Sequence, residues 1–215
     1  MAQIAAYFDM DGTLVDSSGD LCATVNHTRR ELGLGELPDG EILRHVGLGA
    51  KRLLMDSIPE MAHDERRLAE TFMKHYGEHM MESVALYPGV AETLEELARR
   101  GVALGVNTAK PGFATRAILD RLGIRKYFGD AIVAGGECAE MKPSALPLRQ
   151  CAKLLGREVS PDDWMVGDSW TDVDCAAAAG VKSAWCAFGF GRLRDGGSPY
   201  PVKIESFTEM LHWIK

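Results

Sequence analysis

The sequence predicts an α/β fold: a Rossmann-like parallel sheet core with an inserted all-helical cap domain. Short apolar runs without polar alternation recur along the chain, as in strands covered on both faces, and helical patterns lie between most of them. One long segment after the first run has no strand pattern and is helical instead. Strands and helices that alternate in this way indicate parallel strands joined by right-handed crossovers.

The predicted core elements follow one another with little chain between them. A glycine follows each helix, which is the expected signal for a C-terminal stop. The predicted strands are 4–8, 102–106, 131–134, 164–166 and 181–186, and the predicted helices are 91–100, 113–122, 145–155 and 172–179.

Residues 18–85 interrupt this alternation. They contain helical stretches over 20–32, 39–46, 50–57 and 63–81, and no convincing strand. The Pro88-Gly89 pair marks a turn at which the sheet pattern resumes. We therefore predict an α/β catalytic core formed by residues 1–17 and 86–215, and a helical cap domain formed by residues 18–85.

Charge and composition restrict the partners. The net charge is −7 and there is no basic excess to neutralise a nucleic-acid backbone, so we expect no nucleic-acid partner. An acidic protein can still bind a small phosphorylated metabolite through one cation and a few local basic groups. The five cysteines form no close pair, and we see neither a signal peptide nor a membrane-spanning run. We expect a cytoplasmic protein with no membrane partner, as a monomer or homodimer.

Groups that can do chemistry follow the predicted strands. They are Asp9 and Asp11 after the first strand, Thr108 after the second, Lys142 after the third, and Asp168 and Asp172 after the fourth. The carboxyl ends of parallel strands meet at one edge of a sheet, so these groups should lie together. Four unpaired acids would repel one another, and Mg²⁺, which prefers oxygen ligands, would hold them.

This cluster suits phosphoryl transfer. A carboxylate such as Asp9 can attack phosphorus and form an acyl phosphate. Asp11 stands two residues later, where Gly12 lets the chain turn, so its side chain can reach a leaving group. A lysine and a threonine hydroxyl can bind the phosphoryl oxygens, where charge lies in the transition state.

The run Asp9-Met10-Asp11-Gly12-Thr13-Leu14-Val15-Asp16-Ser17 resembles the first motif of the haloacid dehalogenase superfamily, and more narrowly its phosphoglycolate phosphatase-like branch with a helical cap. The resemblance covers nearly the whole chain. Further matching segments are Tyr87-Pro88-Gly89-Val90, Val106-Asn107-Thr108-Ala109-Lys110-Pro111, Lys142-Pro143, and Gly167-Asp168-Ser169 with Asp172. In the predicted cap, Val46-Gly47-Leu48-Gly49-Ala50 resembles the family's substrate-facing loop.

The resemblance implies a magnesium-dependent phosphatase that hydrolyses a small phosphate monoester, of the phosphoglycolate or sugar-phosphate type, through a phosphoaspartate. The implied roles are Asp9 as nucleophile, Asp11 as general acid and base, Thr108, Ala109 and Lys142 as the phosphate-binding residues, Asp9, Asp11 and Asp168 as the magnesium ligands, and Asp172 as the residue that orients the ligand waters. The family often has asparagine where Ala109 stands, so one side-chain contact is missing here.

Several residues have two interpretations. His45, Lys51 and Arg52 flank the cap loop and could contact substrate or be solvated. Lys110 could touch phosphate or face solvent. His75 and His79 have the i, i+4 spacing of metal ligands on a helix, but the sequence shows no third ligand.

Two other functions compete with hydrolysis. A β-phosphoglucomutase-like phosphotransferase has a similar core, but its cap loop typically brings basic and hydroxyl residues to the sugar, and the loop here is apolar. Thr13 also fits the phosphatase branch better. A non-catalytic regulatory module on the same fold would have no need to keep every acid, and all are present. A dehalogenase would not need Asp11.

Overall fold

One parallel sheet forms the centre of the core domain. The computed structural model describes residues 3–194 and 201–215; residues 1–2 and 195–200, which the predicted core range includes, lie outside the described part. The sheet strands are β1 (Ala5–Phe8), β4 (Ala103–Pro111), β5 (Ile132–Gly135), β6 (Trp164–Gly167), β7 (Lys182–Cys186) and β8 (Val202–Ile204). Their order, β5-β4-β1-β6-β7-β8, reverses between β1 and β6, as in Rossmann-like folds. The predicted α/β class is confirmed.

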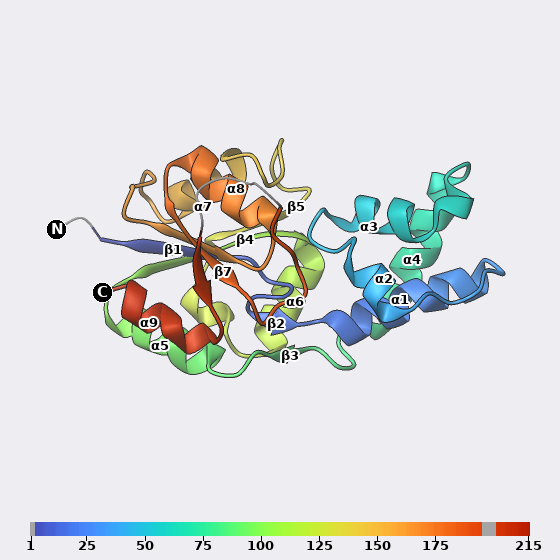
Figure 1. Ribbon diagram of the computed structural model, residues 1–215, viewed down its shortest axis with the longest axis horizontal. Coiled ribbons are helices and arrows are strands. Elements are labelled where there is room, and N and C mark those ends of the chain that lie inside the picture. The colour runs from blue at the N-terminus through green and yellow to red at the C-terminus, as the bar shows by residue number, and fades with distance from the viewer. Residues whose placement is uncertain (1–2, 195–200) are drawn as a thin grey trace.

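Helices cover both faces of this sheet (Figure 1). One face packs against α5 (Val90–Arg99), α6 (Gly112–Arg121) and α9 (Met210–Trp213), and the other against α7 (Leu146–Leu154) and α8 (Trp170–Ala179). The position of strand β1 between the two helix layers explains why its sequence does not alternate between apolar and polar residues. Ala6 and Phe8 face the first layer, Ala5 and Tyr7 face the second, and all four are fully buried.

A separate helical unit lies at the end of the molecule opposite both termini (Figure 1). Its helices are α1 (Ser18–Glu31), α2 (Asp39–Leu43), α3 (Ala50–Ser57) and α4 (Glu65–His79). They enclose their own apolar cluster, in which Val25 of α1 and Phe72 of α4 are buried. Helix α1 packs along α4, so these two helices form the body of the cap.

A two-stranded antiparallel ribbon joins the cap to the core. Strand β2 (Val15–Asp16) pairs with β3 (Ala85–Leu86), so the chain leaves and re-enters the core at one place. Asp20 reinforces this junction, because its carboxylate accepts hydrogen bonds from the backbone N–H groups of Ser83 and Val84.

Most predicted elements lie within two or three residues of the observed ones, with four differences. The strand predicted over 102–106 continues to Pro111, and strand β8, helix α9 and the β2–β3 ribbon were not predicted. Three 3₁₀ turns, Pro59–Met61, Arg125–Tyr127 and Phe207–Glu209, complete the described secondary structure. None of the described helices is both long and apolar enough to cross a membrane.

Candidate active site

The acids of the candidate site lie where the strand order reverses. Asp9 follows β1 and Asp168 follows the neighbouring β6, with Phe8 paired to Val166 just before them. A reversal of strand order opens a crevice at the carboxyl ends of the strands. Asp9, Asp168 and Asp172 each place a carboxylate oxygen within 4.8 Å of the others, and all three side chains are buried. The structure thus brings three of the predicted acids together.

Lys142 lies among these acids. Its Nζ is 2.9 Å from Asp9 Oδ2 and 2.6 Å from Asp172 Oδ1, and its side chain is buried. Burial alone would lower the pKa of Lys142, but the negative charges of Asp172 and Asp9 outweigh it and raise the pKa above its ordinary value. Lys142 therefore stays a cation beside the predicted nucleophile.

Asp172 is fixed from two sides. One carboxylate oxygen binds Lys142, and the other accepts hydrogen bonds from the backbone N–H and hydroxyl of Ser169 at the start of α8. This capping box ends the loop after β6 at a defined position. Asp172 consequently orients Lys142 toward Asp9.

Asp11 has a different set of partners. Its Oδ1 accepts a hydrogen bond from Ser17 Oγ at 2.6 Å and pairs with Lys110 Nζ at 2.8 Å. Lys110 is 5% exposed, so its alternative interpretation as a solvated lysine is wrong. Burial alone would lower the pKa of Lys110, but Asp11 outweighs it and the pKa lies above its ordinary value. Lys110 thus holds a second buried positive charge beside the site.

Asp168 is held by a loop that the sequence did not point to. Its Oδ2 accepts hydrogen bonds from the backbone N–H groups of Phe190, at 3.1 Å, and Gly191, at 2.6 Å. These residues follow β7, and no motif marks them. On the other side, Gly12 has a φ of +78°, and a Cβ there would collide with the Asp168 carboxylate. Residue 12 must therefore be glycine for Asp168 to approach.

The acids fit a bound Mg²⁺ ion. Burial, with Asp172 and Asp11 adding to it and Lys142 opposing, raises the pKa of Asp9 to about 6. Burial and the negative charges of Asp9 and Asp172 likewise raise the pKa of Asp168 well above its ordinary value. Such acids are difficult to keep ionised without a cation, and their donor atoms are all oxygen, which Mg²⁺ prefers. Asp9 and Asp168 would hold the ion through their side chains and Asp11 through its backbone carbonyl.

Magnesium should stabilise the protein more at about pH 8 than at about pH 5. Because the pKa of Asp9 is raised to about 6, the metal-free folded state binds protons that the unfolded chain has lost. Metal-free stability therefore falls as pH rises from about 4 to about 6, and Mg²⁺, which binds the ionised acids, restores it. Thermal unfolding with and without Mg²⁺ at both pH values measures this increment. Asp168→Asn should remove most of this Mg²⁺-dependent stabilisation. Equal stabilisation by Mg²⁺ at both pH values would contradict the assignment of Asp9 and Asp168 as magnesium ligands.

A pocket lies between the core and the cap. Asp9, Asp11, Thr108, Ala109, Lys110 and Pro111 line it from the core, and Leu21, Val46, Gly47, Gly49, Ala50, Leu53, Phe72 and Tyr76 line it from the cap. The predicted phosphate-binding residues Thr108 and Ala109 therefore face the same space as Asp9. Tyr76 supplies a buried hydroxyl with no hydrogen-bond partner among the described residues.

The three cap residues proposed for specificity lie outside the lining of this cavity. Lys51 pairs with Glu65, and Arg52 pairs with Asp56. His45 Nδ1 lies 3.6 Å from the same Asp56 carboxylate. Their neighbours Val46, Gly47 and Ala50 form the cavity wall instead. Substrate contact by these three residues stays a prediction.

Comparison with known proteins agrees with this geometry. The family model for haloacid dehalogenase-like hydrolases matches residues 6–186. A phosphoglycolate phosphatase from Chromobacterium violaceum is 37% identical, over 98% of this chain and 96% of the relative. One from Rhodospirillum rubrum is 38% identical, over 98% of this chain and 90% of the relative.

Solved structures show the same fold. The crystal structure of a predicted phosphoglycolate phosphatase from Haemophilus somnus superposes with a TM-score of 0.91 over all of both chains, at 27% identity. A predicted phosphatase from Clostridium acetobutylicum superposes with a TM-score of 0.82 over 99% of this chain and all of the other, at 24% identity, which supports the fold alone. The chain therefore belongs to the haloacid dehalogenase-like hydrolase family, as a phosphoric monoester hydrolase.

Proposed function

We propose that this protein is a magnesium-dependent phosphatase that hydrolyses small phosphate monoesters, of the phosphoglycolate or sugar-phosphate type, through a phosphoaspartate on Asp9. The observation that carries the proposal is the position of Asp9. Its buried carboxylate lies beside Lys142 and two further acids and lines the pocket between the core and the cap. The phosphoglycolate phosphatases among the relatives support the substrate class.

In the first half-reaction a carboxylate oxygen of Asp9 attacks phosphorus and the bond to the ester oxygen breaks. Lys142 and Thr108 bind the phosphoryl oxygens, where negative charge gathers. Asp11 gives a proton to the departing alkoxide. When bound, Mg²⁺ neutralises negative charge on the phosphoryl group and on the acids around it.

In the second half-reaction a water molecule attacks the phosphorus of the phosphoaspartate. Asp11, now a carboxylate, takes a proton from that water, and the phosphorus–oxygen bond to Asp9 breaks. Inorganic phosphate leaves and Asp9 is a carboxylate again. Ser17 and Lys110 hold the Asp11 side chain throughout both steps, which fixes the direction in which its proton moves.

The cavity limits the substrate to a small molecule. Residues of the cap line it opposite Asp9 and Asp11, so a bulky phosphoprotein would not reach these acids while the cap is in this position. The apolar cap wall offers few partners to the many hydroxyl groups of a sugar.

A panel of phosphate monoesters assayed with Mg²⁺ tests the proposed function. We expect release of inorganic phosphate from p-nitrophenyl phosphate and faster release from a small anionic monoester such as phosphoglycolate. Exhaustive chelation should abolish both activities, and added Mg²⁺ should restore them. Full activity after chelation would overturn the metal assignment. Transfer of the phosphoryl group between sugar positions, without release of phosphate, would identify the mutase alternative instead.

Tyr76→Phe should lower the preference for phosphoglycolate over p-nitrophenyl phosphate. The unpartnered hydroxyl of Tyr76 lines the cavity, so a substrate carboxylate can accept its hydrogen bond, for which we expect a loss of about 3- to 30-fold in relative kcat/KM. Lys51→Ala and Arg52→Ala belong in the same comparison. A selective loss of phosphoglycolate hydrolysis in these two variants would support the predicted contact of Lys51 and Arg52 with substrate. An unchanged preference in Tyr76→Phe would show that the Tyr76 hydroxyl does not bind the substrate carboxylate.

A further inference from the structure

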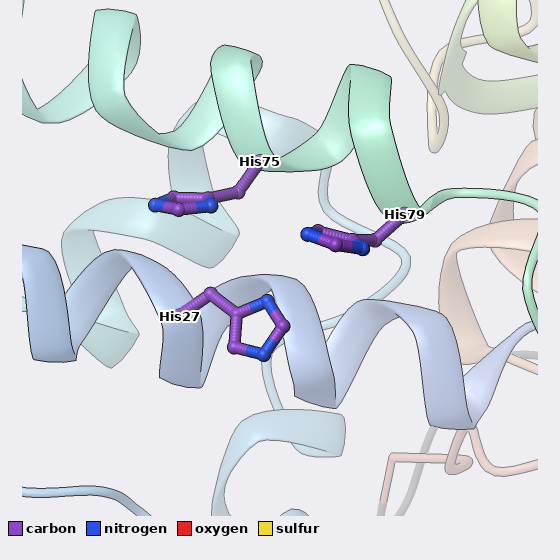
Figure 2. Close-up of side chains that lie close together, drawn as sticks. All are labelled: His27, His75 and His79. Carbon is purple, nitrogen blue, oxygen red and sulfur yellow. The ribbon is translucent and has the colours of Figure 1, made fainter.

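Three histidines of the cap lie close together between α1 and α4. His27 belongs to α1, and His75 and His79 lie one turn apart on α4. One ring nitrogen of each lies within 4.8 Å of those of the other two. Figure 2 shows the His75 and His79 rings nearly parallel to each other on the side of α4 that faces α1, with the His27 ring on α1 next to them. The fold thus supplies the third histidine that the i, i+4 pair lacked in the sequence.

The outer nitrogens of the α4 histidines are already bound by carboxylates. His75 Nε2 lies 2.9 Å from Glu31, and His79 Nδ1 lies 2.7 Å from Glu82. A carboxylate accepts hydrogen bonds, so these two nitrogens carry the ring hydrogens. In the neutral rings the lone pairs then lie on His75 Nδ1 and His79 Nε2. Metal-bound histidines typically have this carboxylate contact on their outer nitrogen, where it fixes the ring and its tautomer.

The inner nitrogen of His75 is available as a ligand atom. His75 Nδ1 is buried and has no hydrogen-bond partner among the described residues. The carboxylate of Glu78 lies 4.0 Å from that atom and 3.8 Å from His79 Nε2. A tetrahedral ion with bonds of about 2.1 Å holds its ligand atoms about 3.4 Å apart, so the three rings, whose nitrogens lie within 4.8 Å of one another, would need to close by up to about 1.4 Å.

Charge around the cluster also favours a cation. Glu31, Glu78 and Glu82 surround three imidazoles, while the nearby cation Lys74 already pairs with Glu31. Burial lowers the pKa of His27, and the positive charges of Arg30, His79 and His75 lower it further. The lowered pKa favours the neutral His27 ring, which has a lone pair available for a metal ion.

We propose that His27, His75 and His79 bind one Zn²⁺ ion that links α1 to α4, with a water molecule as the fourth ligand. Three imidazole nitrogens are a donor set that suits Zn²⁺ and not Mg²⁺, which prefers oxygen ligands. The site is therefore chemically distinct from the all-oxygen cluster of the core. The ion would also fix the turn of α4 that carries Tyr76, because Tyr76 stands between two of the ligands in the chain.

Metal titration of the metal-free full chain tests this site. Excess Mg²⁺ first fills the acidic cluster, and Co²⁺, whose visible spectrum reports tetrahedral coordination, is then added and displaced by Zn²⁺. We expect one equivalent of tetrahedral Co²⁺, its displacement by one equivalent of Zn²⁺, and a rise of several degrees in the unfolding temperature with Zn²⁺. No binding in the presence of excess Mg²⁺ would overturn the proposal.

Variants assign the ligands. His79→Ala and His27→Gln should each weaken Zn²⁺ binding by at least about tenfold and abolish the stabilisation. His63→Ala is the matched control, because His63 is an exposed cap histidine outside the cluster, and it should bind as the wild type does. Thermal unfolding without metal establishes that each variant is folded. Undiminished binding in both His79→Ala and His27→Gln would place the ion elsewhere and refute the site.

Discussion

Asp9→Asn is expected to lower kcat by at least about 10⁴-fold while the protein remains folded. An amide is too weak a nucleophile to form the phosphoaspartate, so the first half-reaction stops. Asparagine has nearly the same shape, and Lys142 keeps its ion pair with Asp172. The variant also removes a carboxylate whose burial disfavours ionisation, so we expect its metal-free unfolding temperature to match or exceed that of the wild type.

Single-turnover experiments separate the nucleophile from the other acids. Rapid quenching followed by intact mass measurement should show a covalent phosphoryl group on the wild type and none on Asp9→Asn. Asp162→Asn is a suitable control, because Asp162 is an exposed aspartate whose one ion pair within the described residues is with the surface residue Lys182. A phosphorylated Asp9→Asn protein would show that another residue is the nucleophile.

Asp11→Asn is expected to lower turnover of an alkyl phosphate by about 10²- to 10⁴-fold. The variant can neither protonate the leaving alkoxide nor accept a proton from the attacking water. A good leaving group such as p-nitrophenolate needs no proton, so its phosphorylation step should lose much less. Comparison of burst and steady-state rates for the two substrates would measure both effects.

Ser17→Ala provides the control for Asp11. It removes one hydrogen bond to the Asp11 carboxylate but leaves the carboxylate and its ion pair with Lys110 in place. We expect a loss well below that of Asp11→Asn, and the same dependence on the leaving group. A loss of less than about tenfold for Asp11→Asn with an alkyl phosphate would contradict a role in general acid–base catalysis.

The core could be predicted because its local signals agree with one another. The run Ala5–Phe8 is apolar at every position, which identifies a strand covered on both faces, and burial of all four side chains confirms it. Strand β8 was missed because three residues at the edge of a sheet, Val202-Lys203-Ile204, carry too little pattern. The extension of β4 to Pro111 was missed because Asn107–Pro111 contains polar residues and proline, which are poor strand formers.

The candidate site likewise contains residues that the sequence identified and residues that it did not. Asp9, Asp11, Lys142, Asp168 and Asp172 could be named because each follows a strand and parallel strands end at one edge. The partners that hold these acids could not be named. Phe190 and Gly191 bind Asp168 through backbone N–H groups, which any residue offers. Nothing in the sequence distinguishes Lys110 from a surface lysine until Asp11 is seen beside it.

By itself the sequence determined the α/β class, the helical insertion and the set of acids. The first two depend on patterns within single segments, and the third depends on the rule that the carboxyl ends of parallel strands meet at one edge of the sheet. Only the tertiary structure decided which groups meet. It buried Lys110 against Asp11, placed Tyr76 in the wall of the cavity and left Lys51 and Arg52 in ion pairs outside it. It also brought His27 to His75 and His79 from a helix about fifty residues away, since contacts between distant segments follow from packing and leave no local pattern.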